Sequence, residues 1–218
     1  MSLTVYGVPL SPFVRKVRVC LAEKVLDYEL KIVLPFDQPD WFVELNPLRR
    51  IPAIKDGDLV LADSSVICQY LEEAYATQTP LMGDGPAQRA QVRWLEKYAD
   101  YELAPVATFV VFRQRVLMPS MKRAVDEAAV QAAMTEKLPP FFDYLEGVLG
   151  AQTFFVGDAL SMADIAIACQ FGNMVHGGEG IDAQRWPQLA AWYERISARP
   201  SFQSMLPGEQ KILASLRG

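Results

Sequence analysis

The sequence predicts a two-domain α+β protein in which a mixed amino-terminal domain is followed by an all-helical one. Short β-prone runs alternate with helical apolar stripes over residues 1–77. Residues 78–86 contain two prolines, two glycines and no apolar periodicity, which is typical of a linker. From residue 87 to residue 218 only the helical periodicity remains, so we expect no strands there.

The first elements predict a β-α-β unit. Residues 3–8 form a β-prone run beside Gly7 and Pro9. Ser11 before Pro12 is a helix-start pattern, because serine can cap the first turn and proline is tolerated at the first helical position. Apolar residues at helical spacing follow, and residues 28–34 supply a second β-prone run. The two strands should be parallel, with a right-handed crossover.

Residues 51–72 predict a strand, a turn, a second antiparallel strand and a helix. Asp63, Ser64 and Ser65 stand directly before the helical stripe, which ends near Tyr75. In one interpretation Ser64 caps the helix and Asp63 complements its dipole. In the other, the positive first turn binds a carboxylate and Asp63 holds an ammonium group. A ligand that carries both a carboxylate and an ammonium group on one carbon, such as the free amino-acid end of a small peptide, would fit both features.

Two long helical stretches follow the linker. The first carries an apolar stripe over residues 92–110, in which Pro105 predicts a kink. The second covers residues 126–149, and Pro139 with Pro140 should bend or split it. Residues 154–157 then form a buried apolar connector.

A capping box marks the centre of the second domain. Ser161 and Asp164 have the spacing at which their side chains satisfy first-turn N–H groups reciprocally. The helix that follows, residues 163–175, is almost wholly apolar and should lie in the core. Pro187 opens another helix, and we expect residues 200–218 to be a short tail. His176 has no partner motif and is assigned no catalytic role.

Composition excludes several classes of function. The net charge of -5 and the pI near 5.0, without a basic tract, argue against a nucleic-acid partner. Cys20, Cys68 and Cys169 are widely separated and set in apolar helical patterns, which indicates buried free thiols and no metal site. No apolar run reaches membrane-spanning length, and no targeting segment is evident. We therefore expect a soluble cytoplasmic protein with no membrane contact.

Four motifs in this order resemble the cytosolic glutathione S-transferases. They are Ser11-Pro12-Phe13-Val14-Arg15, Asn46-Pro47 ahead of Ile51-Pro52, Asp63-Ser64, and Ser161-Met162-Ala163-Asp164. The pattern is similar to bacterial-type members of the serine class and to tau-, theta- and phi-like members. The resemblance implies a thioredoxin-like amino-terminal domain, a helical carboxy-terminal domain, a homodimer and a cis bond before Pro52.

The resemblance also implies a glutathione site. Asp63 and Ser64 match the pair that holds the γ-glutamyl end, and Ile51, before Pro52, matches the backbone partner of the cysteinyl unit. Arg50 stands where the family often places a basic residue near the glycine carboxylate. Asp63 replaces the more usual Glu or Gln, and Arg50 replaces the more usual Lys, so the charges are kept.

Ser11 is the candidate for activating the thiol. The thiolate is the nucleophile, and a hydroxyl that donates a hydrogen bond to sulfur favours the charged form. The alternative role of Ser11 is helix capping, which we expect to need a different orientation of the hydroxyl. Tyr6 is the competing activator, but it falls early in the strand, where core packing is expected. Glutaredoxins and omega-type transferases place cysteine where Ser11 stands, so thiol–disulfide exchange is disfavoured.

The sequence thus predicts an enzyme: a glutathione transferase of the detoxification type that offers the glutathione thiolate to a hydrophobic electrophile. Glutathione is the co-substrate, and no tightly bound cofactor is expected. The candidate electrophile pocket comprises Val8, Leu10, Tyr101, Phe109 and Arg113. Two alternatives remain open: a non-catalytic protein-interaction module of the stringent-starvation type, and a glutathione-dependent isomerase of the zeta type, whose Ser-Ser-Cys pattern differs from Leu10-Ser11-Pro12.

Overall fold

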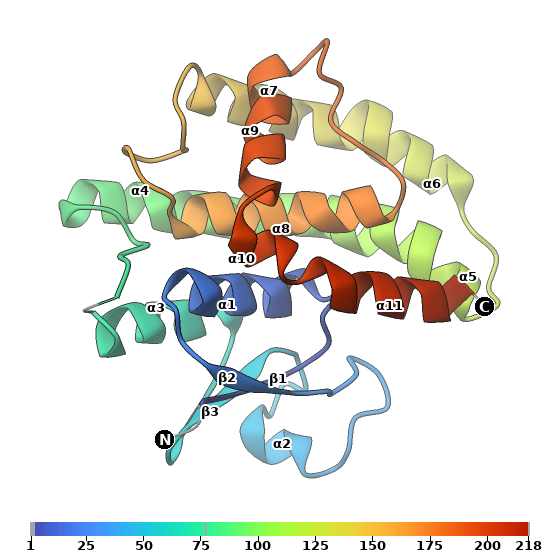
Figure 1. Ribbon diagram of the computed structural model, residues 1–218. Coiled ribbons are helices and arrows are strands. Elements are labelled where there is room, and N and C mark those ends of the chain that lie inside the picture. The colour runs from blue at the N-terminus through green and yellow to red at the C-terminus, as the bar shows by residue number, and fades with distance from the viewer. Residues whose placement is uncertain (1–2, 77, 218) are drawn as a thin grey trace. The chain divides into compact units, whose positions relative to one another are not determined.

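The computed structural model describes residues 3–76 and 78–217. The chain separates into two compact units, Met1–Met82 and Gly83–Gly218. The first unit contains both strands and helices, and the second contains helices alone within the residues that the structure describes (Figure 1). The fold is a thioredoxin-like amino-terminal domain followed by a helical carboxy-terminal domain.

The first unit is built on a four-stranded sheet with the strand order β2-β1-β3-β4. β1 and β2 are parallel and β3 and β4 are antiparallel, as the sequence predicts, and β1 also pairs antiparallel with β3. Val5 on β1 is fully buried and pairs with Leu30 on one side and Ile54 on the other. The strands are β1 (Leu3–Tyr6), β2 (Tyr28–Lys31), β3 (Ala53–Asp56) and β4 (Leu59–Ala62).

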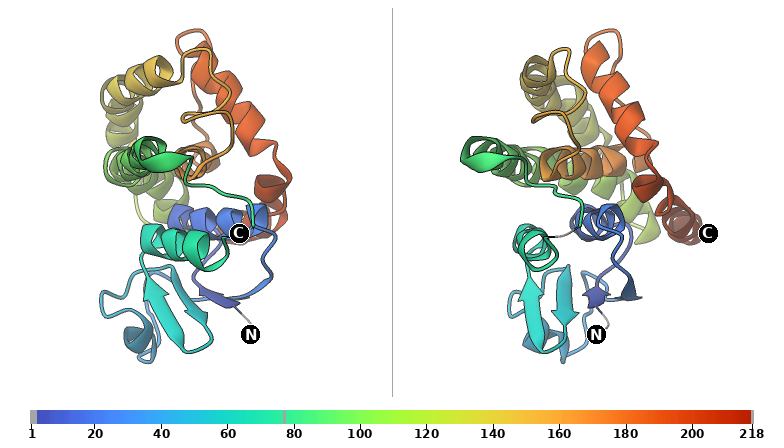
Figure 2. Two further views of the ribbon diagram at one scale, coloured as in Figure 1. Left: turned by 90° about the vertical axis from the view of Figure 1, so that its left-hand side faces the viewer. Right: turned by 60° about the vertical axis from the view of Figure 1, so that its left-hand side comes forward.

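Two amphipathic helices, α1 (Pro12–Glu23) and α3 (Ser64–Ala74), pack side by side and cover one face of this sheet (Figures 1 and 2). Their apolar stripes place Val17, Leu21 and Ile67 out of contact with solvent. The short helix α2 (Phe42–Leu45) lies on the other side of the sheet. This arrangement brings the first turns of α1 and α3 close to the strand ends that precede them.

A buried ion pair joins α1, α3 and the segment that leads out of the first unit. The Lys24 ammonium is fully buried and lies 2.7 Å from Oε2 of Glu72. It also donates to the carbonyl of Thr79 at 2.9 Å. The Glu72 carboxylate in turn accepts from the backbone N–H groups of Leu81 and Met82. The Lys24 ammonium and the Glu72 carboxylate are therefore both hydrogen-bonded to the backbone, as burial of an ion pair requires.

The second unit begins with one long helical rod. α4 (Gly85–Tyr98) continues into η1 (Ala99–Leu117), where π-type hydrogen bonds replace the usual α-helical ones. At its end the N–H of Met118 donates to the carbonyl of Arg113, five residues back. Pro105 lies inside η1, where helical hydrogen bonding continues.

The remaining helices follow the predicted order, with proline at several helix starts. In the predicted stretch 126–149 the helical residues run on without a break from Glu127 to Leu149, so the chain is not split at Pro139 and Pro140; instead a π-type segment, Ala133–Lys137, directly precedes the turn that holds them. The elements are α5 (Met118–Ser120), α6 (Glu127–Ala132), η2 (Ala133–Lys137), α7 (Leu138–Leu149), α8 (Met162–His176), α9 (Pro187–Ser197), α10 (Pro200–Gln203) and α11 (Leu206–Arg217).

The prediction of a short tail after residue 200 is wrong, because this segment forms α10 and α11. Pro207 and Gly208 both fall in the first turn of α11, where proline is tolerated. Glu209 follows them and is 1% exposed. Its Oε2 lies 2.8 Å from Nε2 of His176, at the end of α8. His176 is therefore a partner that holds the carboxy-terminal helix in place.

The core of the second unit is α8, which packs against α4, η1 and α9. The predicted capping box is present at its start. Asp164 is fully buried, and its Oδ2 accepts from the backbone N–H and the hydroxyl of Ser161. Its Oδ1 accepts from the N–H of Phe155 and from the indole of Trp192, each at 3.0 Å. Burial raises the pKa of Asp164, and these four donated hydrogen bonds oppose the rise.

We expect Asp164→Asn to lower the free energy of unfolding by about 2–4 kcal/mol. All four partners are donors, so the amide NH₂ of asparagine must face at least one of them and leave it unpaired. Urea denaturation followed by tryptophan fluorescence measures the change. Asp158→Asn is the matched control, since Asp158 is exposed in the preceding loop. Equal stability of the two variants would contradict this account of the core.

Candidate functional site

The first turn of α3 is capped by Asp63 rather than by Ser64. Oδ1 of Asp63 accepts from the N–H groups of Ser65 at 2.9 Å and Val66 at 3.2 Å. Ser64 is instead the first residue of the helix and is buried. The difference arises because Asp63 adopts a positive φ of 72°, a conformation rare for residues with a side chain, which turns its carboxylate toward the helix N–H groups.

This cap leaves Asp63 available to a ligand. Both helix hydrogen bonds go to one oxygen, Oδ1, and the residue is exposed. The side chain therefore presents a negative charge at the surface, beside the positive first turn of α3. A non-glycine residue in a rare backbone conformation at such a place is a common feature of binding sites. Opposite charges thus stand within one helical turn.

A loop fixed by Asn46 carries Arg50 and Ile51 to the start of β3. The Asn46 side chain, 4% exposed, donates to the carbonyl of Arg50 at 2.6 Å and accepts from the N–H of Leu48 at 3.0 Å. The bond between Ile51 and Pro52 is cis, as the family resemblance implied. Pro52 is buried, Ile51 is half-buried and the Arg50 side chain is exposed. The sequence indicated this loop through Asn46-Pro47, but not the hydrogen bonds that hold it.

Ser11 caps α1 and retains a hydroxyl proton for donation. Its Oγ accepts from the N–H of Val14 at 3.4 Å, which is a long hydrogen bond. A hydroxyl can accept and donate at the same time. The structure shows the capping role of Ser11, and donation of its proton to a ligand stays a prediction. Gly7, with φ 154°, allows the close approach behind this turn, since a Cβ there would overlap the Val14 side chain.

Tyr6 lies in the core, as the sequence suggested. It is 7% exposed and belongs to a buried cluster with Val33, Phe42 and Ala53. Its ring meets Trp41 edge-on, with 6.0 Å between the ring centroids. The position of Tyr6 is therefore explained by packing.

The residues predicted to contact an electrophile come from both units. In the first unit Leu10 is buried and Val8 is half-buried. In the second unit Tyr101, Phe109 and Arg113 lie on η1 and are exposed, the Tyr101 side chain by 65% and that of Phe109 by 54%. Tyr101 also lies beneath the Lys97 ammonium, 5.4 Å from its ring centroid.

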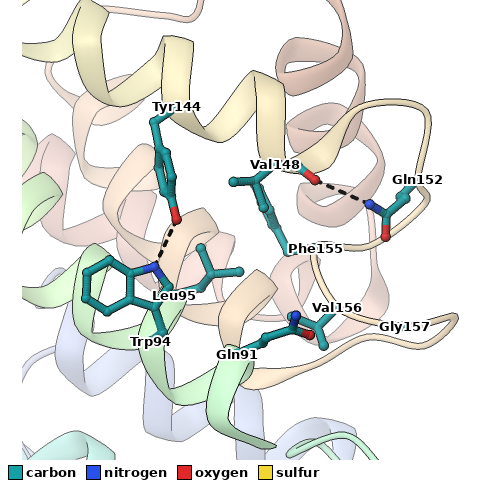
Figure 3. Close-up of a pocket in the computed structure, with 9 residues that line it drawn as sticks. All are labelled: Gln91, Trp94, Leu95, Tyr144, Val148, Gln152, Phe155, Val156 and Gly157. Carbon is teal, nitrogen blue, oxygen red and sulfur yellow. Dashed lines mark hydrogen bonds between the residues drawn. The ribbon is translucent and has the colours of Figure 1, made fainter. Parts of the chain in front are cut away.

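A cavity of about 340 Å³ lies in the second unit, between α4, α7 and the connector that follows α7 (Figure 3). At its edge the Trp94 indole donates to the Tyr144 hydroxyl at 2.9 Å. The nine lining residues carry no charge and include none of the predicted electrophile contacts. They are Gln91, Trp94, Leu95, Tyr144, Val148, Gln152, Phe155, Val156 and Gly157.

Residues 3–76 and 78–217 contain no group of three or more His, Cys, Asp or Glu side chains placed to hold a metal ion. Within the same ranges, no helix combines the length and apolar character needed to cross a membrane. Cys20, Cys68 and Cys169 are free and buried, as the sequence predicted.

Two family models match the chain in succession. Residues 5–80 match the glutathione S-transferase N-terminal domain, and residues 112–206 match the glutathione S-transferase C-terminal domain. Glutathione S-transferase 3 of Zea mays is 36% identical over 211 residues, which cover 92% of this chain and 91% of that protein. FtsZ-localized protein A of Caulobacter vibrioides is 26% identical over 207 residues, covering 93% and 90%.

Solved structures extend the likeness to the whole fold. A glutathione S-transferase from Rhodospirillum rubrum aligns with a TM-score of 0.85 at 32% identity, covering 94% of this chain and 91% of that one. FzlA from C. crescentus aligns with a TM-score of 0.86 at 26% identity, covering 95% and 92%. A thioredoxin-like unit followed by an all-helical unit is the architecture that these proteins share. The chain belongs to the glutathione S-transferase family.

Proposed function

We propose that the protein is a glutathione transferase that binds glutathione in its first unit and offers the thiolate to a hydrophobic electrophile. The observation that carries this proposal is the start of α3, where an exposed carboxylate and a positive helix end stand side by side. The free amino-acid end of glutathione has the complementary pair of charges. Family membership supports the same activity.

In this proposal each part of glutathione has a partner. Asp63 holds the ammonium group, and the Ser64 hydroxyl with the first-turn N–H groups of α3 holds the α-carboxylate. The Ile51 backbone beside Pro52 meets the cysteinyl unit. Arg50, exposed on the loop that Asn46 fixes, meets the glycine carboxylate. The charges of the peptide are thereby matched along its length.

Ser11 is proposed to lower the pKa of the thiol. A thiol with a pKa of about 8.5 is mostly protonated at neutral pH, so stabilising the thiolate raises the concentration of the nucleophile. The Ser11 hydroxyl donates to sulfur while its oxygen continues to cap α1. The first turn of α1 adds a partial positive charge in the same direction.

We expect wild-type protein to bind glutathione with release of protons near neutral pH, and Ser11→Ala to bind it with little proton release. Turnover of the variant should fall by at least about tenfold, since one donated hydrogen bond to a charged group contributes roughly 1.5–3 kcal/mol. Calorimetric titration in two buffers of different ionisation enthalpy counts the protons. Ser215→Ala, in exposed α11, is the control. An unchanged rate and proton count would assign activation to another residue.

Asp63→Asn separates helix capping from ligand binding. Asparagine keeps an oxygen for the two N–H groups and tolerates positive φ, so stability should change by less than about 1 kcal/mol. It removes the charge that faces the ammonium group, and affinity for glutathione should fall by about tenfold or more. Titration calorimetry and thermal unfolding measure the two effects. Retained affinity would show that the charge of Asp63 is not used.

Val8, Leu10, Tyr101, Phe109 and Arg113 stay our candidates for contact with the electrophile, and glutathione is its co-substrate. The three buried free thiols support our proposal that the protein works in the reducing cytoplasm, without a tightly bound cofactor. The acidic charge balance supports the absence of a nucleic-acid partner.

We also propose that the chain is a homodimer. Support comes from the aromatic side chains of the second unit, because Trp94 is 58% exposed and Tyr144 is 39% exposed beside the uncharged cavity. Sedimentation equilibrium should then give a mass near twice 24.4 kDa. Trp94→Asp should shift the equilibrium toward the monomer, whereas Glu73→Asp, which keeps an exposed acidic residue in the first unit, should not. A wild-type mass near 24.4 kDa would contradict the proposal.

A protein-interaction module is the second candidate function. It is favoured by the likeness to FtsZ-localized protein A, whose name describes localisation with FtsZ and no transfer reaction. The glutathione titration separates the two candidates, because a module without the reaction would give no proton-linked binding at millimolar glutathione.

A further inference from the structure

An exposed row of side chains runs along the rod that α4 and η1 form. Its members follow one another at intervals of four residues, which is about one helical turn. They are exposed or half-buried, whereas most residues of η1 between them are buried, and η1 packs against α8. The members of the row are Lys97 on α4 and Tyr101, Pro105, Phe109 and Arg113 on η1.

The middle of this row is apolar and aromatic. Tyr101 and Phe109 stand on either side of Pro105 in the row, and both side chains are more than half exposed. Aromatic side chains bring a large contact area and prefer offset-stacked or edge-on contact with another ring. The middle of the row therefore suits a planar aromatic group.

The two ends of the row differ in charge. At one end the Lys97 ammonium lies over the Tyr101 ring, 5.4 Å from its centroid, and Glu102 is exposed directly after Tyr101. At the other end Arg113 is exposed, and the residues that the structure describes form no ion pair with its guanidinium. A negative charge on a ligand would be repelled by Glu102 and attracted by Arg113. The row thus favours an anionic group at its Arg113 end.

The neighbouring arginine is already engaged by carboxylates of the protein. Arg115 lies 3.0 Å from Glu127 and 3.1 Å from Glu179. Arg113 keeps its planar fork of N–H donors for a carboxylate from outside the chain, to which it can donate two hydrogen bonds at once. Exposure alone does not make an arginine a binding residue. One helical turn from Phe109, however, Arg113 can bind the charge of a molecule whose ring contacts that side chain.

The charge of the whole chain makes a local cation useful at this place. The net charge of -5 repels an anionic substrate, and a glutathione thiolate would repel it further. A guanidinium at the position where the electrophile binds offsets this repulsion. An anionic electrophile therefore has more to gain from Arg113 than a neutral one.

We propose that Arg113 makes the transferase selective for planar aromatic electrophiles that carry an anionic group such as a carboxylate. This inference rests on the proposed function, in which residues of η1 contact the electrophile. The Tyr101 and Phe109 side chains contact the aromatic ring, and the Arg113 guanidinium binds the anionic group. Arg113 is thus a specificity-determining residue that acts on a part of the electrophile that does not react.

The test compares two electrophiles that differ in one charge. Para-chloro-meta-nitrobenzoate is anionic, and para-chloro-meta-nitrobenzamide is its neutral counterpart. In both reactions the thiol proton has passed to solvent, and the thiolate sulfur forms a bond to the ring carbon that carries chlorine. The carbon–chlorine bond breaks, and chloride leaves with its electron pair. Because the two rings differ in intrinsic reactivity, the readout is the ratio of their kcat/KM values in a variant, relative to the same ratio in wild-type protein.

Arg113→Met should lower this preference for the benzoate by about five- to tenfold, since a paired carboxylate loses its bidentate partner. The loss should appear as a higher KM for the benzoate, because the carboxylate is bound alike in the ground state and the transition state. Arg113→Lys keeps the charge without the fork and should retain part of the preference. Steady-state kinetics on the full chain at saturating glutathione measure these values.

Two further variants separate the charge of Arg113 from other effects. Arg113→Gln is a second neutral variant, for use if circular dichroism shows that Arg113→Met does not fold. Arg89→Met removes the same charge from an exposed position on α4, at the other end of the rod, and should leave the ratio unchanged.

The outcomes distinguish this inference from the proposed function, with neutral chlorodinitrobenzene as the reference electrophile. If wild-type protein conjugates the reference but not the benzoate, or if Arg113→Met keeps the wild-type ratio, the selectivity is wrong and the transferase stands. An equal loss with both test electrophiles is such a case, because it reflects packing rather than charge. If wild-type protein conjugates none of the three, both proposals are contradicted. A lower ratio in Arg113→Met but not in Arg89→Met supports the role of Arg113.

Discussion

The cap of α3 by Asp63 is the interaction on which the candidate site depends. It ends the β3–β4 hairpin, satisfies two first-turn N–H groups and holds a carboxylate at the surface. A cap of this kind stabilises a helix by about 0.5–2 kcal/mol. The hairpin and the helix are also joined lower down, where the hydroxyls of Tyr70 and Tyr75 both donate to Asp56. The hydrogen bond to Asp56 raises the pKa of Tyr75 to about 12, and the two bonds together tie the end of α3 to the hairpin.

The second unit uses the same device for a different purpose. Asp164 accepts from Ser161, the residue that precedes α8, and Glu146 on α7 accepts from the N–H groups of Gln188 and Leu189 at the start of α9. Asp164 is fully buried, so all of its hydrogen-bonding capacity serves the core. Asp63 is exposed and keeps capacity for a ligand. Exposure, rather than the capping motif, therefore separates a candidate binding residue from a structural one.

The sequence predicted those features of the fold that depend on local sequence patterns. Strand pairing in the first unit, the capping box at Ser161 and the buried cysteines all follow from periodicity and short motifs. The interpretation in which Ser64 caps α3 is wrong, because the residue type alone does not specify the positive φ of Asp63. Asp nevertheless adopts a positive φ more readily than most residues. The prediction of a short tail is wrong, since α11 holds Pro207 and Gly208 in its first turn, where proline is tolerated.

Contacts between residues far apart in the sequence could not be predicted from such local patterns. The contact of Lys16 with Ser65 and the pair of His176 with Glu209 join positions 49 and 33 residues apart. Periodicity places each of these residues on a helix but does not say which neighbouring helix its side chain meets. The turn at Asn46 could be predicted, because asparagine before proline is a turn signal. The hydrogen bond from its side chain to the Arg50 carbonyl could not, because that contact depends on the folded loop.

In the role proposed for Ser11, a neutral hydroxyl limits how far the pKa of the thiol can be lowered. Tyr6 is packed in the core, so the Ser11 hydroxyl, after the end of β1, is the candidate that can still turn its proton toward a ligand. Its capping bond to Val14 is long, and reorienting the proton toward sulfur disturbs that bond little, since the oxygen lone pairs do the capping. Lowering a pKa by one unit needs about 1.4 kcal/mol, which one hydrogen bond donated to an anion can supply. A larger shift would require a full positive charge next to the sulfur.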